Sequence, residues 1–418
     1  MTNALLLGAD YYGTLAAARC YGKHGIDVTM ADESVIARGM YSRHVKKRLV
    51  HPPYAKPGVL VDWLLDYGAK NPGTLLYAPN DHLAWLFAAH RERLEEVFSM
   101  YTPSEDVMMT LLDKKRLHEA CASVGLDVPK TQMLGDPGTV IGHRWPVILK
   151  PRTQVCLVGG IKGFIAHDER ELETGLARYR RLVRFHEAFA DRYPGIGEPL
   201  VQEYSPSGET SIFSVSGFVT ERGVLVSRAS MKVLQRPRKV GIGLCFEGRP
   251  LEHDLADKLA ALCRRLGYYG CFEAELIAEG DRRLLIDFNP RFYSQMGFEI
   301  ARGLPLPMLV LHAARGDDAQ LARELARART WMPTGNEVYC HKTMLDLLLT
   351  LQGLSGRMSR GDIQRWRQWY AAAELRGVAA DAVRDPEDRM PAVVDAAQWM
   401  QEFGLHFRSF MRSFVLNQ

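Results

Sequence analysis

The sequence predicts a mixed α/β and α+β protein with a helical C-terminal part, on three observations. Short apolar runs alternate with helical stretches in the first part of the chain, apolar residues alternate with a period of two in the middle, and helical spacing prevails after Gly316. We therefore expect an N-terminal α/β domain (residues 1–106), a central domain (107–316) with an inserted lid (about 140–204), and a helical extension (317–418).

The first domain is expected to begin as a parallel β-α-β unit. Apolar runs at residues 4–7 and 26–30 flank a helical stretch at 14–24, and glycines mark the boundaries. Two further strands are expected at 47–50 and 74–77. Together these elements make an α/β domain of about 100 residues.

The central domain is expected to begin with one helix rich in Lys and Arg, at residues 108–124, which Gly125 and Pro129 end. Strands at 147–150 and 200–204 enclose an Arg-rich helical segment. This arrangement indicates a small inserted α+β unit.

An antiparallel sheet is expected beyond the insertion. Period-two alternation predicts strands within residues 210–226 and 270–289, and helical spacing predicts a crossing helix at 252–266. The last hundred residues are expected to be helical to the end. Near the C-terminus Phe407, Phe410 and Phe414 form an apolar stripe, which we expect to pack in the core or against a second subunit of a homodimer.

Composition excludes several classes of protein. Among 418 residues, 53 Lys and Arg balance 49 Asp and Glu, so the net charge of +4 gives no reason to expect a nucleic-acid partner. The seven cysteines are scattered without a C-x-x-C pair, which favours reduced, packing cysteines. We see no signal peptide and no apolar run of about 20 residues, so we expect a cytoplasmic protein with no membrane partner.

Two carboxylates are predicted to face each other across a hairpin within residues 270–291. If the turn is centred on Asp281, Glu275 and Asp287 lie six residues to either side of it and are directly opposed. Their Cβ atoms would be roughly 4.5 to 5.5 Å apart, where like charges are destabilising. Because the two acids repel, we expect Asp287→Asn to leave the ligand-free stability unchanged or slightly higher.

A divalent cation would remove this repulsion. Glu275, Asp287 and Asn289 offer the hard oxygen ligands that Mg²⁺ accepts, and Leu285 is expected on the same face of its strand. Glu273 would replace Glu275 if the register differed. The plainer alternative is that Asn-Pro ends a strand while the acids face water.

The segment Asp-Phe-Asn-Pro-Arg, from Asp287 to Arg291, follows Glu275 by twelve residues and resembles the metal-binding end of the ATP-grasp superfamily. That family more often carries Glu where this chain has Asp287. The resemblance implies an N-terminal pre-ATP-grasp lobe followed by a two-lobed ATP-grasp domain. It also implies ATP held with two Mg²⁺ ions, or Mn²⁺ as an alternative, on Glu275, Asp287 and Asn289.

Further segments resemble the family's motifs in the family's order. They are Asp113-Lys114, the strand that ends in Lys150, and the hinge-like Val201 to Tyr204. The residues that the resemblance assigns to the nucleotide are Lys114 and Lys150 at the phosphates, Gln202, Glu203 and Tyr204 at the adenine, and Glu209 at the ribose.

The lid loop departs from the family because its glycines come late, at residues 159–163. We expect the phosphate cradle to shift toward them, with Lys162 assisting. The resemblance assigns the transferred group to Arg291. Lys232 and Arg236 lie where the family places cations that face the transferred phosphate, so we expect at least one of them in the site.

The overall layout most resembles the carboxylate-amine ligase branch, which includes D-aspartate ligases and L-amino-acid ligases. The resemblance implies an enzyme that forms an amide from a small-molecule carboxylate and an amine through an acyl phosphate, releasing ADP. A catalytically inactive nucleotide sensor or scaffold is the first alternative. A nicotinamide- or flavin-dependent oxidoreductase is the second, and it rests only on the loop from Gly8 to Gly13, where Asp10 replaces the middle glycine of the fingerprint.

Overall fold

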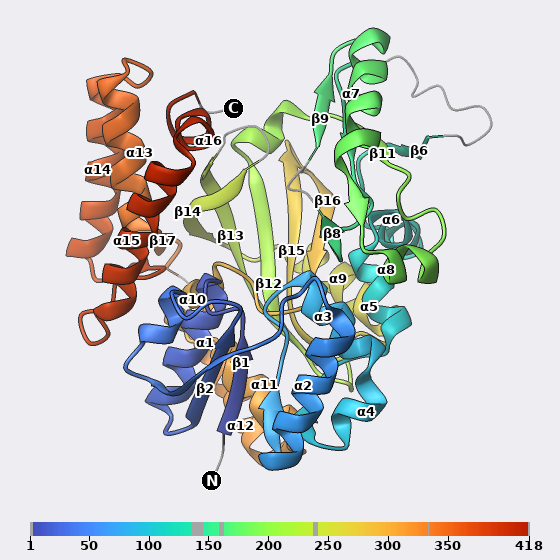
Figure 1. Ribbon diagram of the computed structural model, residues 1–418. Coiled ribbons are helices and arrows are strands. Elements are labelled where there is room, and N and C mark those ends of the chain that lie inside the picture. The colour runs from blue at the N-terminus through green and yellow to red at the C-terminus, as the bar shows by residue number, and fades with distance from the viewer. Residues whose placement is uncertain (1–2, 135–144, 159–162, 237–240, 333, 417–418) are drawn as a thin grey trace.

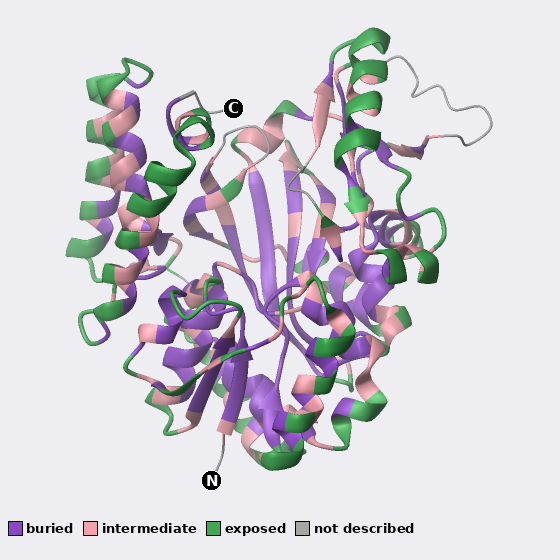
Figure 2. Ribbon diagram, viewed as in Figure 1, coloured by how far each residue is buried: buried purple, intermediate pink, exposed green. Residues whose placement is uncertain are grey.

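The computed structural model describes residues 3–134, 145–158, 163–236, 241–332 and 334–416 (Figure 1). Three parts surround a large central sheet: an N-terminal α/β lobe, a small lid that carries α7, and a group of C-terminal helices. Strands of the central sheet are buried along much of their length, whereas the outward faces of the lid and C-terminal helices are exposed (Figure 2). None of the described helices combines the length and apolar character that a membrane span requires.

The N-terminal lobe is a five-stranded parallel sheet in the order β3-β2-β1-β4-β5. The predicted β-α-β start is confirmed, and β5 is a further strand that was not predicted. The strands are β1 (Asn3–Leu7), β2 (Asp27–Asp32), β3 (Val45–Val50), β4 (Thr74–Leu76) and β5 (Phe98–Met100). The helices are α1 (Tyr12–Lys23), α2 (Pro57–Lys70), α3 (Asp81–Ala89) and α4 (Arg91–Glu95).

The helix expected at residues 108–124 is two helices, α5 (Glu105–Leu112) and α6 (Lys114–Ala122). Asp113 separates them, because its side chain accepts a hydrogen bond from the backbone N–H of Lys115 and so caps α6. The same carboxylate forms an ion pair with Arg152. The break therefore makes Lys114 the first residue of α6, from which its side chain reaches Asp287.

The lid is a four-stranded antiparallel sheet in the order β6-β11-β7-β9, with α7 packed on it. Asp168 caps α7 at the backbone N–H of Glu171. The lid strands are β6 (Thr131–Met133), β7 (Val147–Lys150), β9 (Phe164–Ala166) and β11 (Leu200–Glu203). The other lid elements are α7 (Glu169–Leu182), α8 (Glu187–Arg192) and the short pair β8 (Leu157–Val158) and β10 (Arg184–Phe185).

The central sheet has seven strands in the order β16-β15-β12-β13-β14-β17-β18, antiparallel except for the pair β17–β18. Its strands are β12 (Ile212–Val219), β13 (Leu225–Arg236), β14 (Ile242–Arg249), β15 (Gly270–Glu279), β16 (Arg282–Asn289), β17 (Val338–Cys340) and β18 (Ala379–Asp381). The expected crossing helix is α9 (His253–Leu266), and α10 (Met296–Ala301), α11 (Leu306–Ala314) and α12 (Asp318–Thr330) follow the sheet.

The C-terminal part is helical as predicted but contributes two strands that were not expected. Three-residue strands such as β17 and β18 are too short to show a period of two. Phe410 and Phe414 are buried in a core cluster of this part, whereas Phe407 is 51% exposed. The helices are α13 (Lys342–Leu354), α14 (Arg360–Leu375), α15 (Met390–Leu405) and α16 (Phe407–Met411).

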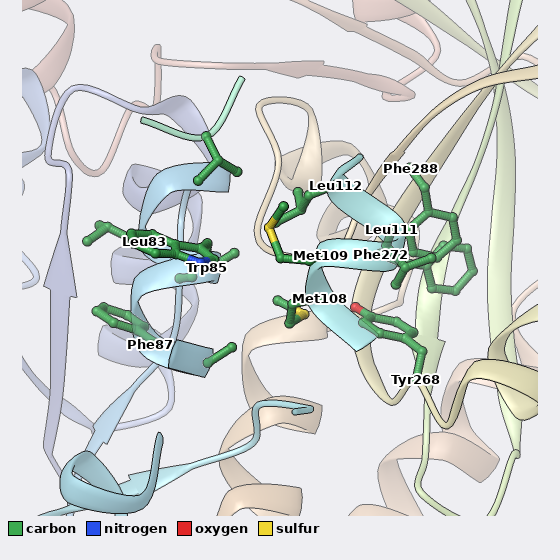
Figure 3. Packing of buried hydrophobic residues seen from close by; sticks show 14 of the residues in the cluster. Leu83, Trp85, Phe87, Met108, Met109, Leu111, Leu112, Tyr268, Phe272 and Phe288 are labelled. Atoms are coloured by element: carbon green, nitrogen blue, oxygen red, sulfur yellow. The ribbon is translucent and has the colours of Figure 1, made fainter. Parts of the chain in front are cut away.

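A shared core supports the hairpin β15–β16 from behind (Figure 3). Phe272 and Phe288 stack at a centroid distance of 5.3 Å and lie in one cluster with Met108 from α5 and Leu83 from α3. Burying these side chains removes apolar surface from water, which is the main force holding the lobe and the hairpin together. The opposite face of the hairpin is therefore presented to the site from a rigid support.

Candidate active site

The hairpin opposes the two carboxylates that the sequence placed together. Glu275 pairs with Asp287, and Glu273 pairs with Asn289. The turn itself differs from the prediction: Glu279 pairs with Arg282, so the loop has two residues, the first of them Gly280 at a φ of 58°.

A one-residue bulge reconciles the turn with the opposed acids. The pairing shifts between Glu275 and Leu276, which leaves Ile286 as an extra residue on β16. The expectation for Leu285 was therefore wrong. It pairs with Leu276 and is fully buried in the core, whereas Asp287 lines the cavity.

Each opposed carboxylate is neutralised by a lysine. Lys114 Nζ lies 2.9 Å from Asp287 Oδ1, and Lys232 Nζ lies 3.0 Å from Glu275 Oε1. Burial alone would raise the pKa of Asp287, but Lys114, followed by Lys150, holds it below its ordinary value. The repulsion inferred from the sequence is thus compensated within the protein.

Lys150 lies at the end of β7, beside β11. Its Nζ donates to Gln202 Oε1 at 2.8 Å, and Gln202 in turn donates to Thr131 Oγ1 at 2.9 Å. Burial and then the nearby charge of Lys114 lower the pKa of Lys150 to about 8. Within the described chain no carboxylate forms an ion pair with this ammonium.

The hinge segment lines the cavity through Gln202, Glu203 and Tyr204. Glu209 does not line it: its carboxylate accepts the Tyr204 hydroxyl at 2.7 Å and borders a second cavity of about 380 Å³ beside α14. Glu209, which the resemblance assigns to the ribose, therefore lies outside the main cavity and is linked to it through Tyr204.

Arg291 joins the hairpin to the N-terminal lobe. Its Nε lies 2.6 Å from Asp81 Oδ1, one Nη donates to Asn289 Oδ1 at 2.8 Å, and the other donates to the Phe292 carbonyl at 3.0 Å. Burial would lower the pKa of Arg291, but Asp81 raises it above its ordinary value. Asp81 was missed from the sequence, although a polar residue just after a parallel strand is a usable signal, because ligands bind at the carboxyl ends of such strands.

Glu273 lies opposite Asn289 in the hairpin and accepts three hydrogen bonds. The donors are the Asn289 amide at 3.0 Å, the Ser214 hydroxyl at 3.2 Å and the Gln295 amide. Burial, followed by the charge of Glu275, raises the pKa of Glu273 to about 8. Glu273 therefore holds Asn289 in place, and Glu275 is the acid across from Asp287.

Arg236 lies outside the main cavity, where its guanidinium stacks 4.0 Å from the centroid of Phe414 and 5.0 Å from that of Trp399. The cause is irregular pairing of β13 with β14 just after Lys232, which brings Lys232 and Gln235, rather than Lys232 and Arg236, to the cavity. Lys162, the other lysine expected at the phosphates, lies outside the described residues.

One cavity of about 760 Å³ lies between the N-terminal lobe, the lid and the central sheet, and it is lined by Lys114, Lys150, Lys232, Glu275, Asp287, Asn289 and Arg291. In the described ranges no three His, Cys, Asp or Glu side chains are grouped as a metal cage. The hairpin instead offers two carboxylates and one amide. One oxygen of each carboxylate is held by a lysine, which leaves the other for a cation that also binds phosphate oxygens.

The cavity is also lined by Tyr11, Tyr54, His82, Cys156 and His186, which lie toward the N-terminal lobe and the lid. His82 Nδ1 lies 3.1 Å from Cys156 Sγ, and the rings of His82 and Tyr54 meet edge-on at 5.6 Å. All seven cysteines, Cys156 included, are buried and free, as expected from their spacing.

The loop from Gly8 to Gly13 has a structural role. A Cβ atom on Gly13 would lie 2.4 Å from the carbonyl oxygen of Tyr293, so glycine is required there for close packing of α1 against the segment after Arg291. This contact accounts for Gly13 without a role in dinucleotide binding.

No protein-family model matches the chain, and no curated protein matches it in sequence. Solved structures match it in fold. The L-amino acid ligase from Bacillus licheniformis aligns with a TM-score of 0.57 and 13% identity, over 75% of this chain and 74% of that one. The biotin carboxylase domain of the Hydrogenobacter thermophilus 2-oxoglutarate carboxylase, solved with MgADP, ADP and bicarbonate, aligns with a TM-score of 0.58 and 18% identity, over 75% and 69%.

The N5-carboxyaminoimidazole synthetase from Staphylococcus aureus aligns with a TM-score of 0.55 and 13% identity, over 75% of this chain and 77% of that one. At these identities the likeness shows the fold. The chain has the ATP-grasp fold that its hairpin motif resembles, and the predicted fold class is confirmed.

Proposed function

We propose that this ATP-grasp protein is an ADP-forming ligase that joins a small-molecule carboxylate to an amine. The observation that carries the proposal is the opposed pair Glu275 and Asp287, which lines one cavity with Lys114, Lys150 and Arg291. A lysine already neutralises each acid, so the pair does not need a metal for stability. A reaction that places divalent cations on phosphate gives this gathering of carboxylates and cationic side chains a purpose.

Lys114 and Lys150 would hold the ATP phosphates, and Gln202, Glu203 and Tyr204 the adenine. Lys150 supports this because it is a partly buried ammonium whose hydrogen-bond partner is a neutral amide. An anionic phosphate would supply the charge that its surroundings lack.

The residues present fit Mg²⁺. Glu275, Asp287 and Asn289 supply oxygen donors, and the lysine ammonium groups now on both acids show that this face accepts positive charge. Two ions are implied by the resemblance, and Mn²⁺ would suit the same donors. Bound there, Mg²⁺ would neutralise charge on the transferred phosphate.

The reaction proceeds in two steps. An oxygen of the substrate carboxylate attacks the γ-phosphorus as the bond to the ADP oxygen breaks, which gives an acyl phosphate. The amine then attacks the acyl carbon, phosphate leaves and the amine loses a proton. Arg291 uses three of its five N–H donors on the protein, so two remain to stabilise the oxygens of the transferred group.

The test is ADP release with amino acids supplied singly and in pairs, with Mg·ATP, and with Asp287→Asn as the inactive control. The proposal predicts ADP release that requires one carboxylate and one amine and is absent in the variant. ATP binding without ADP release for any pair would favour the nucleotide sensor instead.

A further inference from the structure

The end of the cavity next to the N-terminal lobe is built from three separate segments. Tyr54 follows β3, His82 lies in the first turn of α3, and His186 precedes α8 in the lid. His82 contacts Tyr54 ring to ring and Cys156 through Nδ1, while the backbone N–H of His186 donates to the Cys156 carbonyl at 3.0 Å. The cluster therefore joins the lobe to the lid.

Three polar atoms of this cluster are buried and have no hydrogen-bond partner among the described residues: Tyr54 Oη, His82 Nε2 and His186 Nδ1. The Asn80 side chain lies beside Tyr54, although no hydrogen bond joins its amide to the Tyr54 hydroxyl. Buried polar atoms are satisfied in the great majority of cases, and each exception calls for a missing partner. Because all three residues line the cavity, a ligand in the cavity can be that partner.

Two members of the cluster, His82 and Cys156, are uncharged at physiological pH. Burial, followed by the neighbouring His186, lowers the pKa of His82 to about 4, so its ring is neutral at physiological pH. Burial also raises the pKa of the Cys156 thiol to about 12, so the thiol keeps its proton and can donate it to His82 Nδ1, with His82 Nε2–H left as a donor. Asp81, the acid beside His82, is committed to Arg291.

We propose that Tyr54, His82 and His186 form a subsite for an uncharged, hydrogen-bonding group, such as a carboxamide, on one of the two small-molecule substrates. This inference rests on the proposed ligase function and specifies its substrate class. Neither His82 nor Cys156 offers a charge to a carboxylate or ammonium at this place, whereas an apolar group would leave all three polar atoms unsatisfied. The subsite adjoins the reacting end, since Asp81 precedes His82 and holds Arg291.

The test compares side chains of matched shape. Calorimetric binding of L-asparagine, L-aspartate and L-leucine, and of L-glutamine and L-glutamate, is measured on the full chain with Mg·ADP, and ADP release is measured in parallel. We expect asparagine or glutamine to bind about tenfold or more tightly than its acidic and apolar counterparts. The subsite would be overturned if the carboxamide, acidic and apolar amino acids bound equally, if the acids bound more tightly, or if none of them bound.

Two variants place the preference at this cluster. His82→Phe and Tyr54→Phe keep a ring but remove an unsatisfied polar atom, so the carboxamide preference should fall about tenfold while the melting temperature stays equal or rises. His44→Gln is the matched control, because His44 Nε2 also lacks a partner but lies outside the cavity lining. An unchanged preference in both ring variants would remove these residues from recognition.

The two proposals fail in different ways. Carboxamide binding without ADP release would keep the subsite and refute the ligase. ADP release that prefers acidic substrates would keep the ligase and refute the subsite.

Discussion

The two ends of the main cavity differ in how their polar side chains are paired. At the hairpin end the acids Glu275 and Asp287 are each held by a lysine, and Arg291 is held by Asp81. At the lobe end His82 and Cys156 are uncharged, and three buried polar atoms lack a partner within the described part of the chain. The difference indicates that ligands at the charged end exchange one ionic partner for another, whereas a ligand at the neutral end completes hydrogen bonds that the protein leaves unmade.

The largest effect is expected from Asp287→Asn, which should lower ADP release at least about 10³-fold, because it removes a metal ligand from the charged end. The Lys114–Asp287 ion pair also changes the stability expected for this variant. Lys114 would lose its partner in a buried position, so the ligand-free protein should be destabilised by about 1 to 2 kcal/mol, since Asp287 is partly exposed. Urea unfolding measures the change.

The double variant Lys114→Gln with Asp287→Asn is the control. It should recover most of the stability, because both members of the pair are then neutral, without recovering activity. Wild-type stability in Asp287→Asn alone would mean that the ion pair is not formed in solution.

Arg291→Ala comes next, with kcat expected to fall by about 10² to 10³ and the Kd for ATP little changed, because the guanidinium acts on charge that develops during transfer. Asp81→Asn should lower kcat by about tenfold, since it only positions Arg291. Steady-state kinetics and calorimetry separate the two quantities. Weaker ATP binding with no catalysis to lose is what a nucleotide sensor would show.

The pH dependence of ATP binding tests the charge on Lys150. The pKa of Lys150 is about 8, below its ordinary value of 10.5, so the ammonium loses its proton as pH rises through 8. The Kd for ATP should therefore be up to about tenfold weaker at pH 9 than at pH 7. Lys150→Arg stays charged and should bind equally at both values.

Stability should respond to Lys150 in the opposite sense. Between pH 8 and 10.5 the unfolded chain binds the proton that the folded chain has lost, so this group's contribution to stability rises with pH. A wild-type Kd for ATP that is the same at pH 7 and pH 9 would show that Lys150 keeps its proton or does not contact the phosphates.

The smallest effect on turnover is expected from Arg236→Ala. Its guanidinium stacks on Phe414 and Trp399 outside the cavity, so kcat per folded molecule should be unchanged, while stability falls by about 1 to 2 kcal/mol through lost cation–π and packing contacts. Lys232→Ala, four residues earlier in the same strand, is the comparison and should lower kcat. A loss of turnover in Arg236→Ala would return that residue to the site.

The sequence predicted the opposed acids of the charged end, although not Asp81, because the signals for those acids are local. Opposed acids on one hairpin follow from spacing alone, and a bulge at Ile286 kept the pairing of Glu275 with Asp287 even though the turn lay elsewhere. The irregular pairing of β13 with β14 had the opposite effect on the prediction, because it places Arg236 outside the cavity. Bulges shift which side chains share a face, and single-sequence patterns do not reveal them.

The neutral end was not predicted because its residues come from three distant segments. Nothing in the local sequence around Tyr54, His82 or His186 places them together, and an unsatisfied atom is defined only by its surroundings. The strands β17 and β18 were missed for a related reason, since each is held in the sheet by its neighbours rather than by its own pattern.

The most direct test of the ligase is to follow oxygen. The carboxylate substrate found by ADP release is labelled with ¹⁸O, and the products are analysed by mass spectrometry. Because a carboxylate oxygen attacks the γ-phosphorus and stays with phosphate when the amine displaces it, the account predicts one ¹⁸O in each phosphate released together with ADP. Unlabelled phosphate, or label in AMP, would contradict an acyl phosphate intermediate in this cavity.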